Sequence, residues 1–534
     1  MTVAALSPAR PRAAANPWLV AAVVVVPTFM EVLDTTIALV ALRYIAGGLS
    51  ATSDDGEWVI TSYLAANAVI LPITGWLSAH LGRRNYFLAS IAIFTLSSLL
   101  CGLAGSLGQL ILFRVIQGLA GGGLQPSSQG VLLDAFPTEK QGMAMTLFGF
   151  AALIAPIVGP TLGGWITDSY SWRWVFLINV PVGLLALAGS YALLREPGYL
   201  VAQRAELRKQ PFRFDSIGFS LLVIVMVCWE VMLSKGQQWD WLGDPFWRVQ
   251  TLAICCIAGL PGLVFWELRH RNPVVNFRPL RERNFASCCL IIFCAYLALF
   301  AATKSLLGLL QSLFGYDALS TGLVMSPSGI VAVIVMPIVG RLIGLRMDAR
   351  WLIAAGLLIM TAGNYWMSQL NLDISPGQAV WPRVVVVAGL AMCFAPANVA
   401  AYLYTPMALR GAAVGLLSFL RNEGGSVGVS LSQTFEERRD QFHVLRLGEY
   451  LDPFNAAANS FLAQTRAFFL QQTGDPAASQ QLAWDQLETL RQQQASALSF
   501  FDCFWMVAAL TLAVAFVVLL MKRSVAAKGV HPAS

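Results

Sequence analysis

Apolar residues in this chain form long runs that are separated by short polar segments. A helix needs about 20 apolar residues to cross the hydrocarbon core of a membrane, so each run of that length predicts one transmembrane helix. The pattern therefore predicts an all-α polytopic membrane protein with fourteen spans. The expected spans are 18–41, 57–79, 86–105, 109–133, 142–167, 174–194, 215–234, 247–268, 285–311, 319–343, 351–370, 381–405, 411–434 and 500–521.

The first run resembles a signal peptide only superficially. It is too long for one and it contains Glu31 and Asp34, so we expect it to be retained as the first span. Composition agrees with a membrane setting, because 57% of residues are hydrophobic and 12% are charged, against about 25% charged residues in soluble domains.

The distribution of basic residues predicts the orientation in the membrane. Lys and Arg are concentrated in one alternate set of loops and near both ends of the chain, which places those segments and both termini in the cytoplasm. The net charge of +6 follows from this bias and does not indicate a nucleic-acid partner. The short loops on the opposite side and their flanks contain only Arg43, Arg173, Lys235, Arg248 and Arg383.

Several chemistries lack their sequence signals. The nine cysteines show no C-x-x-C spacing, and the four histidines are scattered without an H-E-x-x-H pattern, so we expect neither a disulfide framework nor a metal site. No G-x-x-x-x-G-K-[ST] loop is present. We therefore expect a protein that is not an enzyme, has no cofactor and does not take its energy from bound ATP.

An internal repeat predicts the domain organisation. Pro72–Leu77 reads PITGWL and Pro337–Leu342 reads PIVGRL, and each copy precedes basic residues. Duplicated halves of this kind build two bundles that move about a site at the membrane midplane. We expect an N-terminal six-helix bundle at 1–194, a linker with two inserted transmembrane helices at 195–284, and a C-terminal six-helix bundle at 285–534.

Five motifs share a pattern of glycines, prolines and single charges within apolar helices. In chain order they are LDTTI at 33–37, GWLSAHLGRR at 75–84, RVIQG at 114–118, APIVGPTLGG with WRWVFLINVPVG at 155–164 and 172–183, and RNEGGSVG at 421–428. Their order and spacing resemble the fourteen-span drug:proton antiporters of the major facilitator superfamily, in particular the EmrB-type multidrug exporters. The chain departs from the family loop motif at Ala79, where the motif carries Asp.

The resemblance implies the major facilitator fold and proton-coupled export of hydrophobic or amphipathic small molecules across the bacterial inner membrane by alternating access. It also implies a tripartite efflux system, with a periplasmic membrane-fusion adaptor and an outer-membrane channel as partners. Two alternatives remain open, namely a membrane sensor or lipid-binding scaffold without transport and a proton-coupled uptake symporter. The residues expected to serve conformational change are Gly75, Gly82, Arg83, Arg84, Pro156, Gly159, Pro160, Gly163 and Gly164.

Within this set, Gly159 and Pro160 are expected where the fifth span meets the opposite half. Small residues allow close approach of membrane helices. A bulky side chain at Gly159 is therefore expected to disturb the movement of the two bundles.

Charges at membrane depth indicate where coupling occurs, because each is costly to insert. Glu31 and Asp34 lie three residues apart and so on one face of the first helix. We expect them, with Arg114, to exchange the proton, and Asp34 is the first choice of carrier. In the alternative, one of these acids only pairs with Arg114 and joins the first and fourth spans.

The second half contains a smaller set of candidate cavity residues. Lys304 lies near the middle of the ninth span, with Tyr296 and Phe300 beside it, and Arg421 and Glu423 lie in the thirteenth. We expect Lys304 to face the cavity and to favour anionic or polar substrates. The alternatives are a snorkelling Lys304, a local Arg421–Glu423 ion pair, and ordinary packing for the aromatic residues.

The segment 436–499 is the one long polar stretch between spans. Apolar residues recur at helical spacing in 454–468 and 483–497, and TGDPAAS at 473–479 supplies a turn. We therefore expect a helical hairpin on the outer face. It serves either as an adaptor docking surface or only as a cap.

Overall fold

The computed structural model describes residues 16–136, 140–209, 214–270, 273–345, 347–373, 375–406, 409–452 and 454–524, and all regular structure in these ranges is helical. The first part of the chain forms α1 (Pro17–Gly48), α2 (Ser53–Gly56), α3 (Trp58–Leu81), α4 (Arg83–Leu103), α5 (Leu107–Gly121), α6 (Leu124–Ala135), α7 (Gln141–Ser169), α8 (Trp174–Leu177) and α9 (Asn179–Leu193). The middle part forms α10 (Gly198–Lys209), α11 (Ser216–Lys235), η2 (Trp241–Gly243), α12 (Arg248–Arg269) and η3 (Arg278–Arg281). The last part forms α13 (Arg283–Gly308), η4 (Leu309–Leu313), α14 (Ala318–Met325), α15 (Pro327–Gly344), α16 (Ala349–Ser368), α17 (Pro376–Leu403), α18 (Arg410–Gly448), α19 (Ala456–Thr473), α20 (Pro476–Ala515) and η6 (Phe516–Leu520).

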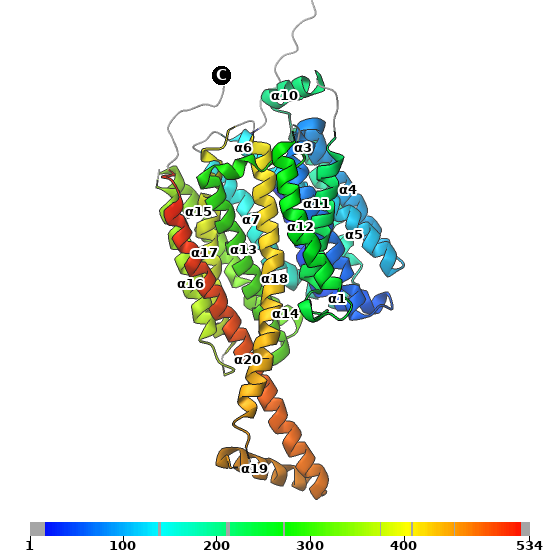
Figure 1. The fold of residues 1–534 in the computed structure, drawn as a ribbon, viewed down its shortest axis with the longest axis vertical. Helices are drawn as coiled ribbons and strands as arrows, with labels where there is room; N and C mark the ends of the chain where they lie inside the picture. The colour runs from blue at the N-terminus through cyan, green and yellow to red at the C-terminus, as the bar shows by residue number, and fades with distance from the viewer. Residues whose placement is uncertain are drawn as a thin grey trace, which may run out of the picture.

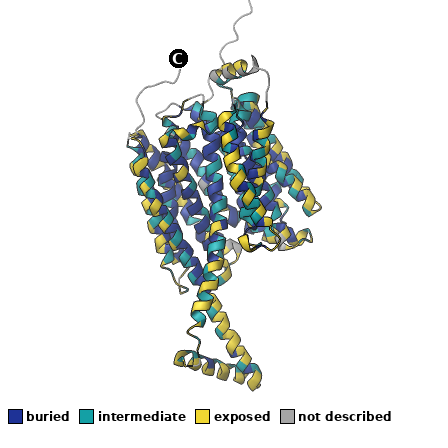
Figure 2. Ribbon diagram, viewed as in Figure 1, coloured by how far each residue is buried: buried dark blue, intermediate teal, exposed yellow. Residues whose placement is uncertain are grey.

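The long helices run side by side as one bundle, and α18 and α20 extend beyond it at one end (Figure 1). Buried residues concentrate inside the bundle, whereas exposed residues cover its outer faces and most of the extension (Figure 2). Many of the exposed residues on the bundle are large and apolar, such as Leu185 at 75% and Ile257 at 75%. A surface of this kind fits contact with lipid rather than water.

The number of membrane spans is only partly settled by the structure. In the described part of the chain, eleven helices are long and apolar enough to cross a membrane, or twelve with the bent helix α7. The expected spans 351–370 and 411–434 correspond to α16 and α18, which lie within the same bundle but are not among these helices. The all-helical polytopic class is confirmed, while the count of fourteen stays a prediction.

Two expected spans are not straight helices. The span expected at 109–133 is divided between α5 and α6 at a turn around Gly122. Helix α7 bends by 43° between its segments Met143–Pro156 and Val158–Ser169. Pro160 explains this bend, because its ring removes the hydrogen bond to the carbonyl of Pro156 and clashes with it.

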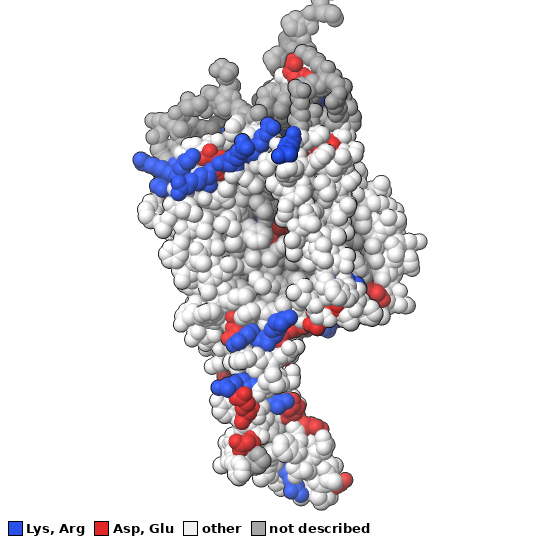
Figure 3. Space-filling view, in the orientation of Figure 1, with Lys and Arg blue, Asp and Glu red and all other residues white. Residues whose placement is uncertain are grey.

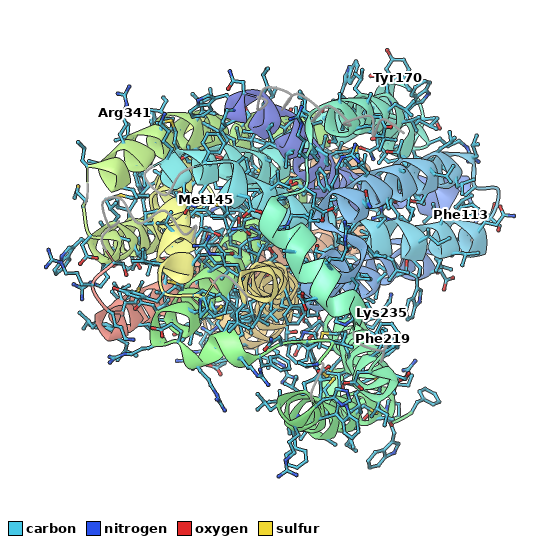
Figure 4. The ribbon with its side chains drawn as sticks, turned by 90° about the horizontal axis from the view of Figure 1, so that it is seen from above. Phe113, Met145, Tyr170, Phe219, Lys235 and Arg341 are labelled. Atoms are coloured by element: carbon cyan, nitrogen blue, oxygen red, sulfur yellow. The ribbon has the colours of Figure 1, made fainter. Side chains whose placement is uncertain are left out.

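The helices divide around a central interface, as the view from above makes clear (Figure 4). Phe113 and Tyr170 lie on one side and Arg341 on the other, while Phe219 and Lys235 mark the α11–α12 pair on a third side. Helix α7 packs against α1 and also against α14, α15 and α17 of the later part of the chain. Helix α11 packs on both α3 and α18. The boundaries 194/195 and 284/285 remain predictions.

Tight contacts join the two halves at the end of the bundle opposite α19. A Cβ on Gly75 of α3 would lie 2.8 Å from the carbonyl carbon of Gly411 in α18, so the two backbones touch there. Gln129 Nε2 donates to Asn398 Oδ1 at 2.6 Å, and Thr146 Oγ1 donates to the Met336 carbonyl at 3.3 Å. This end of the interface is therefore closed.

The polar segment 436–499 is helical but continuous with its neighbouring helices. Helix α18 runs without a break to Gly448, and α20 continues from Pro476 into the bundle. Helix α19 crosses the tip between them (Figure 1). Its end at Gly474, which has φ +68°, falls in the expected turn, and Asp475 caps the start of α20.

Candidate transport cavity

A cavity lies between the halves, and the empty space at this site, which includes open solvent at its mouth, is about 1330 Å³. Its lining runs from Glu31 to Leu42 on α1 and includes Glu57 beside the start of α3 and Ser234 near the end of α11. These helix ends lie toward α19, so the cavity opens on that side. The molecular surface is hollowed between the helices on the face shown in Figure 3. Most of the accessible surface of the lining is apolar, although 13 of the 24 lining residues are polar, and such a cavity suits an amphipathic molecule.

Glu31 lies in the cavity lining and links the two halves through an amide. Gln125 of α6 donates to the Glu31 carboxylate and accepts from the Arg421 guanidinium of α18. Asn67 Nδ2 at 3.2 Å and the Tyr63 hydroxyl at 3.3 Å donate to Glu31 Oε1. Glu31 therefore has neutral donors as its direct partners, and Arg421 lies one residue beyond them.

Asp34 is placed in a different environment, inside the N-terminal half. Its Oδ2 lies 2.5 Å from Arg114 Nη1, and both side chains have 0% exposure. Asn179 Nδ2 at 2.8 Å and Gln117 Nε2 at 3.1 Å donate to its other oxygen. A guanidinium and two amides thus compensate the ionised Asp34.

These positions correct the expected grouping of Glu31, Asp34 and Arg114. Among the described residues, the acid that pairs with Arg114 is Asp34, and Arg114 is not in the cavity lining. Three residues advance an α-helix by about 300°, which leaves side chains about 60° apart. On α1 that offset directs Glu31 toward α6 and Asp34 toward α5 and α9, so one face of the helix supplies two separate sites.

Three residues expected from the C-terminal half line the cavity as expected. Tyr296 and Phe300 of α13 lie with their ring centroids 6.3 Å apart, and both are in the lining with Arg421. The Arg421 guanidinium carbon lies 5.2 Å from the Phe148 ring and 5.9 Å from the Tyr296 ring. Arg421 is thus held between aromatic faces from both halves.

The alternative of a local Arg421–Glu423 ion pair is not observed. Residues two apart on a helix point in nearly opposite directions. Glu423 is buried behind the cavity wall, where its Oε2 accepts from Trp229 Nε1 of α11 at 2.7 Å. Its other neighbour is Glu230, a cavity-lining acid on α11 that our sequence analysis did not identify.

Lys304 does not have the expected position. Its ammonium pairs with Glu436 of α18, and Ser305 donates to the same carboxylate. Lys304 is absent from the cavity lining. The expectation that it favours anionic substrates was therefore based on a wrong location, because nothing near Lys304 in the chain indicates a partner 132 residues away.

The loop motif between α3 and α4 lies at the closed end of the interface. Arg83 pairs with Asp134 of α6 and donates to the Gly130 carbonyl at 3.1 Å. Arg84 donates to the carbonyls of Leu194 at 2.8 Å and Tyr191 at 3.0 Å. Gly82 has φ +89°, a conformation that favours glycine, and it permits the sharp turn between the two helices.

The glycines of the α7 motif contact the first helix and not the opposite half. A Cβ on Gly159 would clash with the Thr36 side chain, and one on Gly163 would lie 3.2 Å from Ile37 Cγ2. Thr161 makes the contact with the opposite half, against Gly322 of α14. Pro156, Pro160 and Gly164 are buried in the same helix. The expected location of Gly159 was wrong, because Gly159 and Gly163 lie on the side of α7 that packs against α1.

Other functional residues missed from the sequence are uncharged amides. Gln117, Gln125 and Asn179 bridge the charged groups described above. Polar side chains inside otherwise apolar runs were visible in the sequence and could have indicated them. Glu230 lies in the expected span 215–234 and met the same criterion as the acids that we selected.

Fold and cavity define a membrane carrier with two helical halves around a central binding site. A family model described as Major Facilitator Superfamily matches residues 24–429. The Multidrug export protein EmrB of Haemophilus influenzae is 38% identical over 447 residues, which are 84% of this chain and 86% of that protein. The protein of the same name from Escherichia coli is 35% identical over 489 residues, which are 91% of each chain.

Similarity to solved structures supports the fold alone. The crystal structure of the human organic anion transporter MFSD10 has a TM-score of 0.58 and 15% identity, with 94% of this chain and 99% of that chain covered. The chain therefore belongs to the major facilitator superfamily, among the EmrB-type proteins.

Proposed function

We propose that this protein exports hydrophobic or amphipathic small molecules, including drugs, across the bacterial inner membrane in exchange for protons. One observation carries this proposal: a cavity with mainly apolar walls contains a carboxyl group, Glu31, that is joined through Gln125 to the opposite half. EmrB relatives from two bacteria carry the name multidrug export protein, which supports export over uptake or a scaffold without transport.

The distribution of charged residues supports an assignment of the two ends of the bundle to the two sides of the membrane. Lys and Arg form a band across the end of the bundle opposite α19 (Figure 3). Arg341, Arg350 and Lys522 belong to helix ends on this side. By the positive-inside rule this end faces the cytoplasm and α19 faces the periplasm. The open cavity then corresponds to the outward-facing state. Both chain termini, which lie outside the described residues, are assigned to the cytoplasm.

In this mechanism Glu31 carries the proton and Asp34 positions Arg114. Protonation of Asp34 would leave a buried guanidinium without its counter-ion, which is strongly unfavourable. Protonation of Glu31 breaks no direct ion pair, because its direct partners are amides and a phenol. The exchange of substrate for proton at Glu31 then changes the Gln125–Arg421 link and with it the contact between the halves.

The protruding segment supports a further proposal, a tripartite assembly. Phe454, Phe468 and Trp484 are 94%, 56% and 48% exposed there. Apolar side chains this exposed fit a partner with a helical surface, as a periplasmic adaptor leading to an outer-membrane channel would provide. Changing all three to Ser should remove adaptor co-purification and cellular resistance while transport in vesicles persists. Full resistance and retained adaptor would leave the segment as a cap.

The export proposal is tested in proteoliposomes with the orientation fixed. An inward-directed proton gradient should drive a hydrophobic fluorescent drug against its concentration gradient, and collapse of the gradient should stop the flux. Transport that is unaffected by collapse of the proton gradient would contradict proton coupling. Accumulation only in the direction of the proton flux would support the uptake alternative.

A further inference from the structure

A second pair of carboxyl groups lies in the cavity wall where α11 meets α18. Glu230 is in the cavity lining, with 0% exposure, and Glu423 behind it is 3% exposed. The two side chains face each other, and the Ser426 hydroxyl lies beside Glu230. Nothing in the export mechanism above uses this pair.

The pair lacks the partners that buried carboxylates require. In the part of the chain that the structure describes, no donor completes a hydrogen bond to either oxygen of Glu230 or to Oε1 of Glu423. Trp229 Nε1, 2.7 Å from Glu423 Oε2, provides the pair with one hydrogen bond. Two adjacent ionised carboxylates without a counter-charge are unstable, so the pair has to take up a proton or another positive charge.

The charged groups on neighbouring helices do not supply that charge. The other charged residues in the lining are Glu31 on α1, Glu57 beside α3 and Arg421 on α18, while α12 and α13 contribute none. Lys235, at the end of α11 (Figure 4), pairs with Glu57 at 2.5 Å. Arg421 is held by Gln125. The lining thus contains three acids and one base, an excess of negative charge.

We propose that Glu230 and Glu423 form a cation site, which holds either a proton shared between the two carboxyls or the positive group of an amphipathic substrate. This proposal rests on the proposed export function and specifies its substrate class. The pair with one shared proton has a charge of −1. A substrate cation that enters displaces that proton to solvent, and the loaded site again has a net charge of −1.

The position of the Glu230–Glu423 pair favours the exchange of a proton for a substrate cation. Tyr296 and Phe300 line the same cavity and can contact the apolar body of a substrate while its charge lies at the acids. Helix α11 contacts both α3 of the N-terminal half and α18 of the C-terminal half. A cation bound between α11 and α18 therefore lies at a contact that changes when the halves move.

The test uses two ions of the same shape and opposite charge, tetraphenylphosphonium and tetraphenylborate, with the purified full-length protein. Calorimetry in buffers of different ionisation enthalpy measures affinity and proton release together. We expect the wild type to bind the phosphonium with proton release. Glu230→Gln and Glu423→Gln should each weaken its binding by roughly tenfold or more and remove the proton release. Glu230→Asp, which keeps the charge, should largely restore binding.

Glu437→Gln is the matched control. Glu437 is an exposed acid on α18, the helix of Glu423, and it is outside the cavity lining. Its carboxylate accepts a hydrogen bond from Gln237, just beyond α11. The control variant should bind like the wild type. An unchanged melting temperature of Glu230→Gln would show that the variant is folded, and weak binding of tetraphenylborate by the wild type would show that the site selects for positive charge. Unchanged phosphonium binding in both Gln variants, or no binding by the wild type, would overturn the cation site. Failure of wild-type vesicles to export would instead contradict the proposed function.

Discussion

Two polar networks lie one turn apart on the first helix, and they differ in what surrounds the carboxyl group. Asp34 is enclosed within the N-terminal half and paired with a cation. Glu31 lies in the cavity lining and contacts the opposite half through Gln125. Tyr63 touches both, because its ring packs on Arg114 at 4.2 Å and its hydroxyl donates to Glu31. The role of a carboxylate at membrane depth therefore depends on the partners around it and not on its depth alone.

The largest expected effect follows from breaking the enclosed network. Asp34→Asn leaves Arg114 buried without its counter-ion, and loss of one partner of a buried pair costs about 3–5 kcal/mol. We expect a marked fall in melting temperature and in the yield of folded protein. The double variant Asp34→Asn/Arg114→Gln should recover much of the stability. A stable, well-folded Asp34→Asn single variant would contradict the positioning role.

Glu31→Gln should leave the fold intact but remove coupling. The amide keeps the size of the side chain and removes the proton site, so we expect proton-driven export to fall by about 100-fold or more, the size of effect typical for loss of a positioned proton-transfer group. Counterflow of substrate without a gradient should continue. Loss of counterflow together with export would indicate a binding or folding defect instead.

Gly159→Leu should disturb both networks together, because both carboxyls lie on α1 and α7 packs on that helix at Thr36. Overpacking of this kind costs about 1–3 kcal/mol. We expect lower stability and slower transport. Gly47→Leu is the control, since a Cβ at Gly47 meets nothing within 4 Å. Equal effects at the two positions would contradict the close helix contact.

Gln125→Leu should affect only the hydrogen-bonded link between the two halves. The change removes the bridge from Glu31 to Arg421 and leaves the Asp34–Arg114 pair untouched. We expect slower transport with nearly unchanged melting temperature, whereas Gln117→Leu should lower stability more. The two variants, compared by thermal unfolding and vesicle flux, should thus show opposite rankings.

The smallest effect is expected at Lys304. The Lys304 side chain is 32% exposed, its partner Glu436 is buried at 8%, and Lys304 is outside the cavity lining. Lys304→Gln should therefore leave the relative transport of anionic, neutral and cationic compounds unchanged. A selective loss of anionic substrates in that variant would restore the role expected from the sequence.

Sequence alone predicted the helical membrane class and the family. It also selected Glu31, Asp34 and Arg421, which the structure buries and whose roles stay predictions. Local sequence patterns are sufficient for these predictions, because the length of an apolar run and the charges within it are visible in one segment of the chain. They do not specify which neighbour a side chain meets across the bundle. Lys304 meets Glu436, Gly159 meets Thr36 and Glu230 meets Glu423 through helix orientation, which no single segment determines.

The central claim, that Glu31 and not Asp34 carries the proton, is tested most directly by counting protons per exported molecule in proteoliposomes. The wild type, Glu31→Gln and the stabilised double variant Asp34→Asn/Arg114→Gln are compared under one gradient. We predict coupled proton flux in the wild type and, at a reduced rate, in the double variant, with none in Glu31→Gln. Coupled flux in Glu31→Gln together with its loss in the double variant would contradict this account.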